Sequence, residues 1–114
     1  MDLQTEQHED AIHITVAEAR IDSAVAVRFK DRMREVSADG PRRVILDLRH
    51  VDFLDSSGLG AVVAVMKLLG PDRELELCHL TPNVEKVFRL TRMDRVFTIH
   101  KDCGTAFSGR QSVA

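Results

Sequence analysis

The stretch VDFLDSSGLGAVV, residues 51–63, holds the residues of this chain whose types and spacing are most suited to chemistry. It places an acid, Asp55, and two serines, Ser56 and Ser57, between two apolar runs, with glycines following. A helix cap explains this pattern, because Asp and Ser side chains accept hydrogen bonds from the unpaired N–H groups of a first helical turn. An exposed hydroxyl there could also be a nucleophile, part of a phosphate-binding loop, or a site of modification.

Three enzymatic motifs fit this stretch poorly. A nucleophile elbow needs glycine two residues before and two after the serine, and the earlier position holds Leu54 or Asp55. A phosphate-binding loop ends in Gly-Lys-Ser/Thr, whereas the nearby lysine is Lys67, far down the next apolar run. The Gly-Leu-Gly triplet supplies part of a dinucleotide fingerprint, but Val63 stands in place of its third glycine. We expect no enzyme, and a truncated nucleotide-binding fold is the enzymatic alternative.

The remaining chemical interpretation makes a serine the substrate of a kinase. A phosphate in the first turn of a helix adds roughly −1.5 to −2 charges and faces the positive end of the helix dipole. It would also lie beside Asp52 and Asp55. The charge of this surface would then change sharply with little change in the fold, so a docked partner would be expelled by repulsion and desolvation.

Length and composition favour one ordinary globular domain. The chain has 114 residues, of which 44% are hydrophobic and 30% charged, so we expect a single domain over 1–114 with residues 108–114 frayed. Sixteen basic and 18 acidic residues are well mixed, and the five aromatic residues are all Phe, which argues against nucleic acid and membranes as partners. The acidic N-terminus has no apolar leader, and we expect a cytoplasmic protein.

The elements that must position the serines follow from hydrophobic periodicity. Alternating or β-branched runs predict strands, and apolar residues three or four positions apart predict helices. Helices that alternate with strands indicate an α/β domain, for which we expect a mixed sheet of about five strands covered by about four helices. The expected strands are LQTE (3–6), 11–16, 42–48, 73–80 and 95–100. The expected helices are 23–37 with an Asp22/Ser23 cap, 57–69 closed by Gly70 and Pro71, 82–90 capped by Thr81, and a weak turn at 105–107.

The helix expected at 57–69 carries a second signal. A helix that is apolar almost all round is either buried on both sides or offers a surface of small residues to another protein. In a domain of this size we favour the docking surface over burial. The inward stripe is Leu59, Val62, Val63, Val65, Met66 and Leu69, and the opposite face is Gly60, Ala61, Ala64 and Leu68, interrupted only by Lys67.

The cysteines and histidines suggest no metal site. Cys78 and Cys103 lie far apart in a chain with a sufficient core, and we expect reduced thiols rather than a disulfide. Adjacent residues of a strand point to opposite faces, so Cys78 and His79 do not easily share an ion. His100 with Cys103 is the other close grouping, and the spacing supplies no set of about four convergent ligands. We therefore expect neither a metal nor a cofactor.

The segment VILDLRHVDFLDSSGLGAVV, residues 44–63, resembles the hallmark of STAS domains, and among them of the bacterial anti-sigma factor antagonists. The segment ARIDSAVAVRFKDRM resembles the family's Gly-x-Leu-Asp and first helix, with Ala19 in place of the glycine. The segment LELCHLTPNVEKVFRLTRMDRVFTIH resembles its later strand, Pro-started helix and final strand. The likeness spans nearly the whole chain and implies a STAS-like fold.

The resemblance also implies a partner switch in signal transduction and transcription regulation. Unphosphorylated members bind a serine kinase of the GHKL ATPase type that doubles as an anti-sigma factor, and so free the sigma factor. Phosphorylation of one serine breaks this complex, and a PP2C-type phosphatase resets it. The family's acceptor is the first serine after the aspartate, which here is Ser56. Ser57 is implied to serve local structure and docking, and we expect it to belong to the helix cap. Asp22 is implied to lie close to the kinase-binding surface.

We therefore predict a bacterial regulator that acts by protein–protein interaction as an anti-sigma factor antagonist and a phosphoprotein. The alternative is a STAS scaffold or lipid-transport complex subunit that binds a partner through the 57–69 helix without phosphorylation. The predicted phosphorylation site is Ser56. The predicted partner-binding residues are Asp22, Asp55, Ser57, Gly58, Gly60, Ala61, Ala64 and Leu68.

Overall fold

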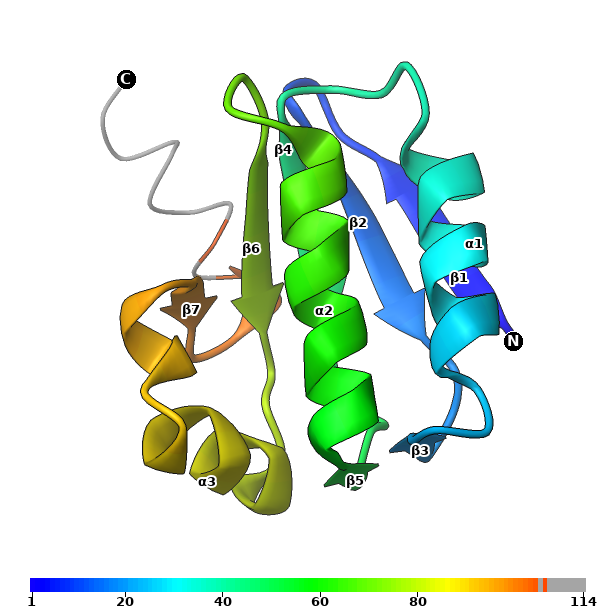
Figure 1. Cartoon of the computed structure of the whole chain (residues 1–114). Coiled ribbons are helices and arrows are strands. Elements are labelled where there is room, and N and C mark those ends of the chain that lie inside the picture. Colours follow the sequence, from blue (N-terminus) through cyan, green and yellow to red (C-terminus); the bar gives the residue numbers. More distant parts are fainter. Residues whose placement is uncertain (105, 107–114) are drawn as a thin grey trace.

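The computed structural model describes residues 1–104 and 106, which form a sheet with helices on it (Figure 1). The strands are β1 (Leu3–Gln7), β2 (Ala11–Val16), β3 (Arg20–Ile21), β4 (Arg43–Asp47), β5 (Phe53–Leu54), β6 (Glu74–Cys78) and β7 (Thr98–His100). The helices are α1 (Ala26–Ser37), α2 (Ser56–Leu69) and α3 (Pro82–Leu90), with a short 3₁₀ helix, η1 (Met93–Arg95).

Five strands form the main sheet in the order β1-β2-β4-β6-β7. β1 pairs with β2 antiparallel, and the remaining neighbours are parallel, as crossovers through helices require. β3 and β5 form a separate parallel pair. Figure 1 shows α1 and α2 side by side over one face of the main sheet, with α3 at the end of the sheet where β5 lies. The predicted α/β class and mixed five-stranded sheet are confirmed.

The start of the first expected helix needs correction. The helix expected at 23–37 begins at Ala26, because Asp22 makes a turn: its Oδ1 accepts from the N–H of Ala24 at 3.1 Å, and its carbonyl accepts from Ala26 at 2.9 Å. Val25 is the N-cap residue and no side chain caps this helix, so the predicted Asp22/Ser23 cap is wrong. The expected helices 23–37, 57–69 and 82–90 are present as α1, α2 and α3. The turn expected at 105–107 and the frayed end at 108–114 lie outside the described residues except for Ala106, which is helical, as are Cys103 and Gly104.

The helix-covered side of the sheet holds the apolar core. Alternation along β2, β4 and β6 sends every second side chain under α1 and α2, where α1 contributes Phe29 and Met33 from one face. Each large apolar side chain that is fully buried here stabilises the fold by about 1.5–3 kcal/mol. The fully buried strand and loop residues of this core are Ile14, Val16, Ile21, Val44, Leu46, Leu48, Val51 and Leu77.

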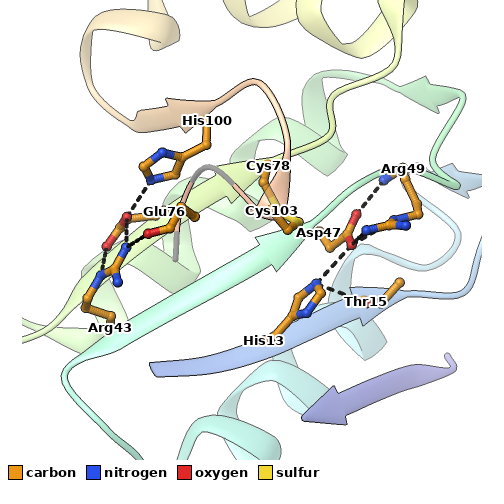
Figure 2. The surroundings of a disulfide bond; sticks show 10 residues. His13, Thr15, Arg43, Asp47, Arg49, Glu76, Cys78, His100 and Cys103 are labelled. Carbon is orange, nitrogen blue, oxygen red and sulfur yellow. Dashed lines mark hydrogen bonds and ion pairs between the residues drawn. A yellow bond between two sulfur atoms is a disulfide. The ribbon is translucent and has the colours of Figure 1, made fainter. Parts of the chain in front are cut away.

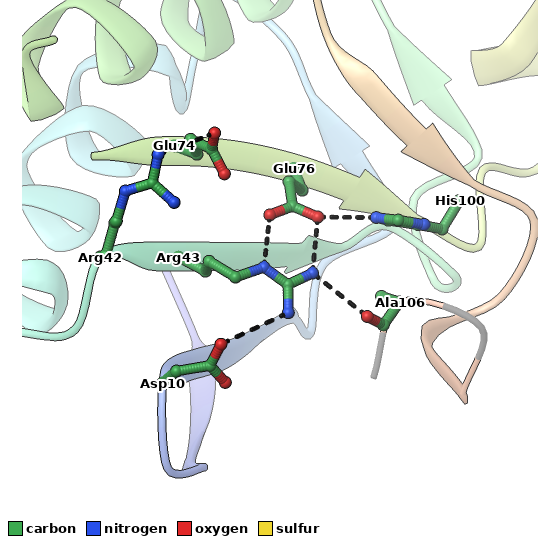
Figure 3. Close-up of polar contacts among 7 residues, drawn as sticks. All are labelled: Asp10, Arg42, Arg43, Glu74, Glu76, His100 and Ala106. Carbon is green, nitrogen blue, oxygen red and sulfur yellow. Dashed lines mark hydrogen bonds and ion pairs between the residues drawn. The ribbon is translucent and has the colours of Figure 1, made fainter. Parts of the chain in front are cut away.

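The opposite side of the sheet is polar and nevertheless buried. The guanidinium of Arg43 on β4 donates to both carboxylate oxygens of Glu76 on β6, each at 2.7 Å, and donates to the carbonyl of Ala106 at 3.1 Å (Figure 3). His100 lies 2.7 Å from the same carboxylate. Burial raises the pKa of Glu76, but hydrogen bonds from Arg43 and His100 outweigh it, and the net shift is downward. Glu76 therefore stays ionised inside this network.

A disulfide between Cys78 and Cys103 holds the segment after β7 against this polar side. The Cα atoms lie 5.3 Å apart, within the range that a disulfide requires. Ala11, Ile45 and Ala106 surround the bridge as a small second cluster of buried apolar residues. The predicted reduced thiols are thus wrong: the chain turns back after β7, so cysteines 25 residues apart meet across the sheet.

We expect Glu76→Gln to lower the free energy of unfolding at pH 7 by about 3 kcal/mol, since it leaves the buried guanidinium of Arg43 without its charged partner. Urea titration followed by circular dichroism measures this. The matched control is Glu74→Gln on the same strand, because Glu74 pairs with Arg42 at the surface and its loss costs less than about 1 kcal/mol.

The same pair predicts a pH dependence. The pKa of Glu76 is lower in the folded chain than in the unfolded one, so its stabilisation is complete above the ordinary carboxylate pKa and is lost as the pH falls below about 4. Between pH 6 and pH 3, about the range over which carboxylates titrate, the unfolding free energy of Glu76→Gln should therefore fall less steeply than that of the wild-type chain. If Glu76→Gln and Glu74→Gln lowered the free energy of unfolding equally at neutral pH, the role assigned to the buried pair of Arg43 and Glu76 would be contradicted.

Candidate partner-binding site

Asp55 connects the start of α2 to a distant loop. Its Oδ1 accepts a hydrogen bond from the N–H of Gly58 at 2.8 Å, which is the N-cap interaction of α2. Its Oδ2 accepts from the N–H of Ser23 at 3.2 Å. Capping by Asp55 is therefore confirmed, and the predicted role of Ser57 in the cap is wrong, because the aspartate already satisfies the N–H group that a serine would take.

The short pair of β3 and β5 brings the two acidic turns together. Ile21 pairs with Leu54 in parallel register, so Asp22 and Asp55 follow at equivalent positions beyond the two strands. The carbonyl of Ala19 also accepts from the N–H of Asp52 at 2.7 Å. Two acids that are 33 positions apart in the sequence thus lie at one edge of the molecule, next to the first turn of α2.

Ser56 is the first residue of α2, and its side chain and that of Ser57 are exposed. The first turn of a helix carries unpaired N–H groups and the positive end of the helix dipole, which favour an added anion. Ser56 therefore presents a hydroxyl at a rigid and accessible position, between an electropositive helix end and the acidic turns. This geometry suits a phosphate acceptor.

Two of the predicted partner-binding residues are buried. A Cβ atom on Gly58 would lie 2.0 Å from the carbonyl oxygen of Ile21, so the first turn of α2 packs directly on the backbone of β3. Ala61 is 3% exposed and belongs to the core, which makes its assignment to the outer face wrong. The reason is that α1 packs beside α2, so a broader stripe of α2 is covered than a sheet alone would cover.

The remaining residues of the predicted face are accessible. Gly60 is exposed, Ala64 is half-buried and Leu68 is 45% exposed. A shallow groove between α1 and α2, here called the α1/α2 groove, is lined by Lys30, Arg34, Ala64, Val65 and Leu68. The sequence analysis did not select the two bases, although their spacing of four residues places them on one face of α1.

Phe53 and Arg20 are a second pair that the sequence analysis missed. Phe53 is 40% exposed on β5, and the guanidinium carbon of Arg20 lies 4.1 Å from the centre of its ring. The same arginine donates to Asp22 at 3.3 Å. Because Leu54 is buried, strand alternation turns Phe53 outward, and that pattern could have identified it. The pair extends the accessible surface from Ser56 to the acidic turn.

Residues 2–106 match the STAS domain family, and the chain belongs to that family. BtrV of Bordetella bronchiseptica, which its name assigns provisionally to the anti-sigma factor antagonists, is 33% identical over 91 residues, which cover 79% of this chain and 78% of BtrV. The crystal structure of an anti-sigma factor antagonist from Mycobacterium paratuberculosis superposes with a TM-score of 0.83 at 25% identity, covering 95% of this chain and 92% of that one.

Two structures of SpoIIAA show the fold alone. SpoIIAA of Bacillus in its unphosphorylated form superposes with a TM-score of 0.73 at 19% identity, covering 96% of this chain and 97% of that one. Its phosphorylated form superposes with a TM-score of 0.66 at 17% identity, covering 94% and 98%. Within residues 1–104 and 106, no helix has the length and apolar character needed to span a membrane.

The close approach at Gly58 gives a direct test of how the site is built. Gly58→Ala should lower the free energy of unfolding by about 1–3 kcal/mol, because the methyl group collides with the backbone of Ile21. Gly60→Ala is the matched control two residues along the same helix: nothing lies within 4 Å of its Cβ position, so alanine should stabilise by about 0.5–1 kcal/mol. Thermal and urea unfolding measure both, and a stabilised Gly58→Ala would contradict this packing.

Proposed function

We propose that this protein is an anti-sigma factor antagonist, a binding protein and not an enzyme, which works by partner switching. When Ser56 is unphosphorylated, the protein binds an anti-sigma factor that is also a serine kinase of the GHKL ATPase type. Phosphorylation of Ser56 releases the complex, and a PP2C-type phosphatase restores binding. The observation that carries this proposal is the exposed hydroxyl of Ser56 at the first residue of α2, beside the turns of Asp22 and Asp55.

The electrostatics of this position favour release without unfolding. A phosphate on Ser56 would face the N-terminal end of a 14-residue helix, where a negative charge is stabilised. It would add its charge to the two neighbouring carboxylates, so an acidic or apolar partner surface would be repelled and would have to desolvate the phosphate. The hydrogen bonds that Asp55 accepts from Gly58 and Ser23 do not involve the Ser56 hydroxyl, so we expect the fold below the phosphate to be retained.

The α1/α2 groove supplies the rest of the docking surface. Its lining combines three apolar residues, Ala64, Val65 and Leu68, with two bases, Lys30 and Arg34. Apolar contacts bordered by bases suit a partner segment with apolar and acidic side chains. Ser56 lies at the N-terminal end of the helix that forms one wall of this groove, so modification and docking concern one continuous surface.

The relatives support the same function. BtrV and the mycobacterial structure are named as anti-sigma factor antagonists, and SpoIIAA exists in unphosphorylated and phosphorylated forms. An antagonist binds an anti-sigma factor, and we extend that partner class to this chain. The scaffold or lipid-transport role would use the same helix face and differ in having no phosphorylation, so the experiment below separates the two.

We expect a cognate GHKL-type kinase with ATP to add one phosphate to this chain, at Ser56. Intact mass and fragment mass spectrometry measure the number and position of the phosphate. Ser56→Ala should remain bound to the kinase, whereas Ser56→Asp should bind at least about tenfold more weakly, which is about 1.4 kcal/mol. Ser57→Ala is the matched control, which should still be phosphorylated at Ser56.

Pull-down and isothermal titration with the purified kinase measure binding of each variant. Phosphate on Ser57 instead of Ser56 would refute the assignment of the acceptor. No phosphate, together with equal binding of Ser56→Ala and Ser56→Asp, would refute the switch and support the scaffold role.

A further inference from the structure

Four residues with metal-binding side chains converge on the polar side of the sheet, far from Ser56. They are His13, Asp47, Cys78 and Cys103, and one ligand atom from each lies within 4.8 Å of those of all the others. Figure 2 shows His13 and Asp47 beside the disulfide, on neighbouring strands. Two cysteines, a histidine and a carboxylate are a donor set that Zn²⁺ accepts in tetrahedral sites.

The sheet register creates this cluster. Asp47, at the end of β4, pairs with Cys78, at the end of β6, and with Thr15 on β2. His13 precedes Thr15 by two positions and so lies on the same face of the sheet. Cys103 comes from the segment after β7, which covers that face. The four ligands come from separate elements, so no ligand spacing in the sequence reveals them.

The cluster is already arranged for a cation. Asp47 is fully buried, and its Oδ2 lies 2.9 Å from Nε2 of His13. Arg49 donates to the same carboxylate through its backbone N–H at 3.0 Å and its Nε at 2.8 Å. The carboxylate is therefore held in one orientation.

A structural disulfide alone does not account for these neighbours. Ala11, Ile45 and Ala106 are its apolar neighbours, and His13 and Asp47 are its polar ones. The buried Asp47 carboxylate is already paired with Arg49, so a bound cation would need the negative charge of two thiolates beside it. With two thiolates, the Asp47 carboxylate, Zn²⁺ and the Arg49 guanidinium, the net charge of the cluster would be zero.

We propose that the reduced form of this protein binds one Zn²⁺ through Cys78, Cys103, His13 and Asp47, and that the disulfide is the metal-free, oxidised alternative. A dithiol supplies two electrons and two protons, which convert the disulfide into two thiols, and is itself oxidised to a disulfide. Zn²⁺ then displaces both thiol protons into solvent. His13 binds through Nε2, and the proton that Nε2 now donates to Asp47 moves through solvent to Nδ1.

The geometry requires only side-chain movement. Zn–S bonds of about 2.3 Å in a tetrahedron place two sulfur atoms about 3.8 Å apart. The two sulfur atoms are bonded to each other in the disulfide and would have to separate to this distance on reduction. The four ligand atoms already lie within 4.8 Å of one another, so small side-chain movements would complete the site. Either state, metal or disulfide, holds the segment that contains Cys103 on the sheet.

The test uses the full chain, reduced with a phosphine and freed of metal. Titration with Co²⁺ should give one ion per chain, with thiolate-to-cobalt charge-transfer absorption and the intense visible bands of tetrahedral cobalt. Zn²⁺ should displace the cobalt with one-to-one stoichiometry. The oxidised chain should bind at least a hundredfold more weakly, about 2.7 kcal/mol by the tenfold rule. Equal binding by the oxidised chain, or no stoichiometric binding by the reduced chain, would overturn the proposal.

Variants identify the ligands. Cys103→Ser and His13→Gln should each weaken Zn²⁺ binding at least tenfold, and the cobalt complex of Cys103→Ser should lose part of its charge-transfer absorption. His100→Gln is the matched control, a histidine on the same side of the sheet that contacts Glu76 and not the cluster. Metal-free circular dichroism shows whether each variant folds, and the wild-type cobalt spectrum tests the site without any variant.

His8→Gln examines a second group of candidate ligands, Glu6 with His8 and His13, of which Glu6 and His8 lie at the surface. Unchanged binding in this variant supports the buried cluster. Loss of binding in His8→Gln together with retained binding in Cys103→Ser would place the ion at the surface and overturn the proposal.

Discussion

The bridge made by Asp55 is the interaction on which the site depends. One carboxylate accepts hydrogen bonds from the first turn of α2 and from the loop after β3, and so fixes the helix relative to a segment more than thirty positions away. This bridge works only because Gly58 lets the helix backbone approach the carbonyl of Ile21. Ser56 is exposed at a defined position because its neighbours on both sides are held in this way.

The two sides of the sheet are stabilised by different interactions. On the helix side, apolar residues of β2, β4 and β6 are buried under α1 and α2, and area burial drives the packing. On the other side, the alternation of the same strands buries Arg43, Asp47 and Glu76, whose charges must be paired. The fold meets this need with two ionic clusters and with the segment that the Cys78–Cys103 bridge holds over them.

Local patterns predicted most elements well, because each depends on residues close together in the sequence. Alternation placed β2, and the spacing of Phe29 and Met33 placed α1. The start of α1 was misplaced, because the carbonyl and carboxylate of Asp22 form a turn that competes with the helix. The pair of β3 and β5 was missed, because strands of two residues carry no periodicity.

The sequence by itself determined the α/β class, the order of the main elements and the acidic, serine-containing start of α2, since these follow from propensity and periodicity within short windows. Only the tertiary structure decided which faces are accessible. The packing of α1 beside α2 removed Ala61 from the surface, and the return of the chain after β7 joined Cys78 to Cys103. Both outcomes depend on contacts between distant segments, for which one sequence contains no local signal.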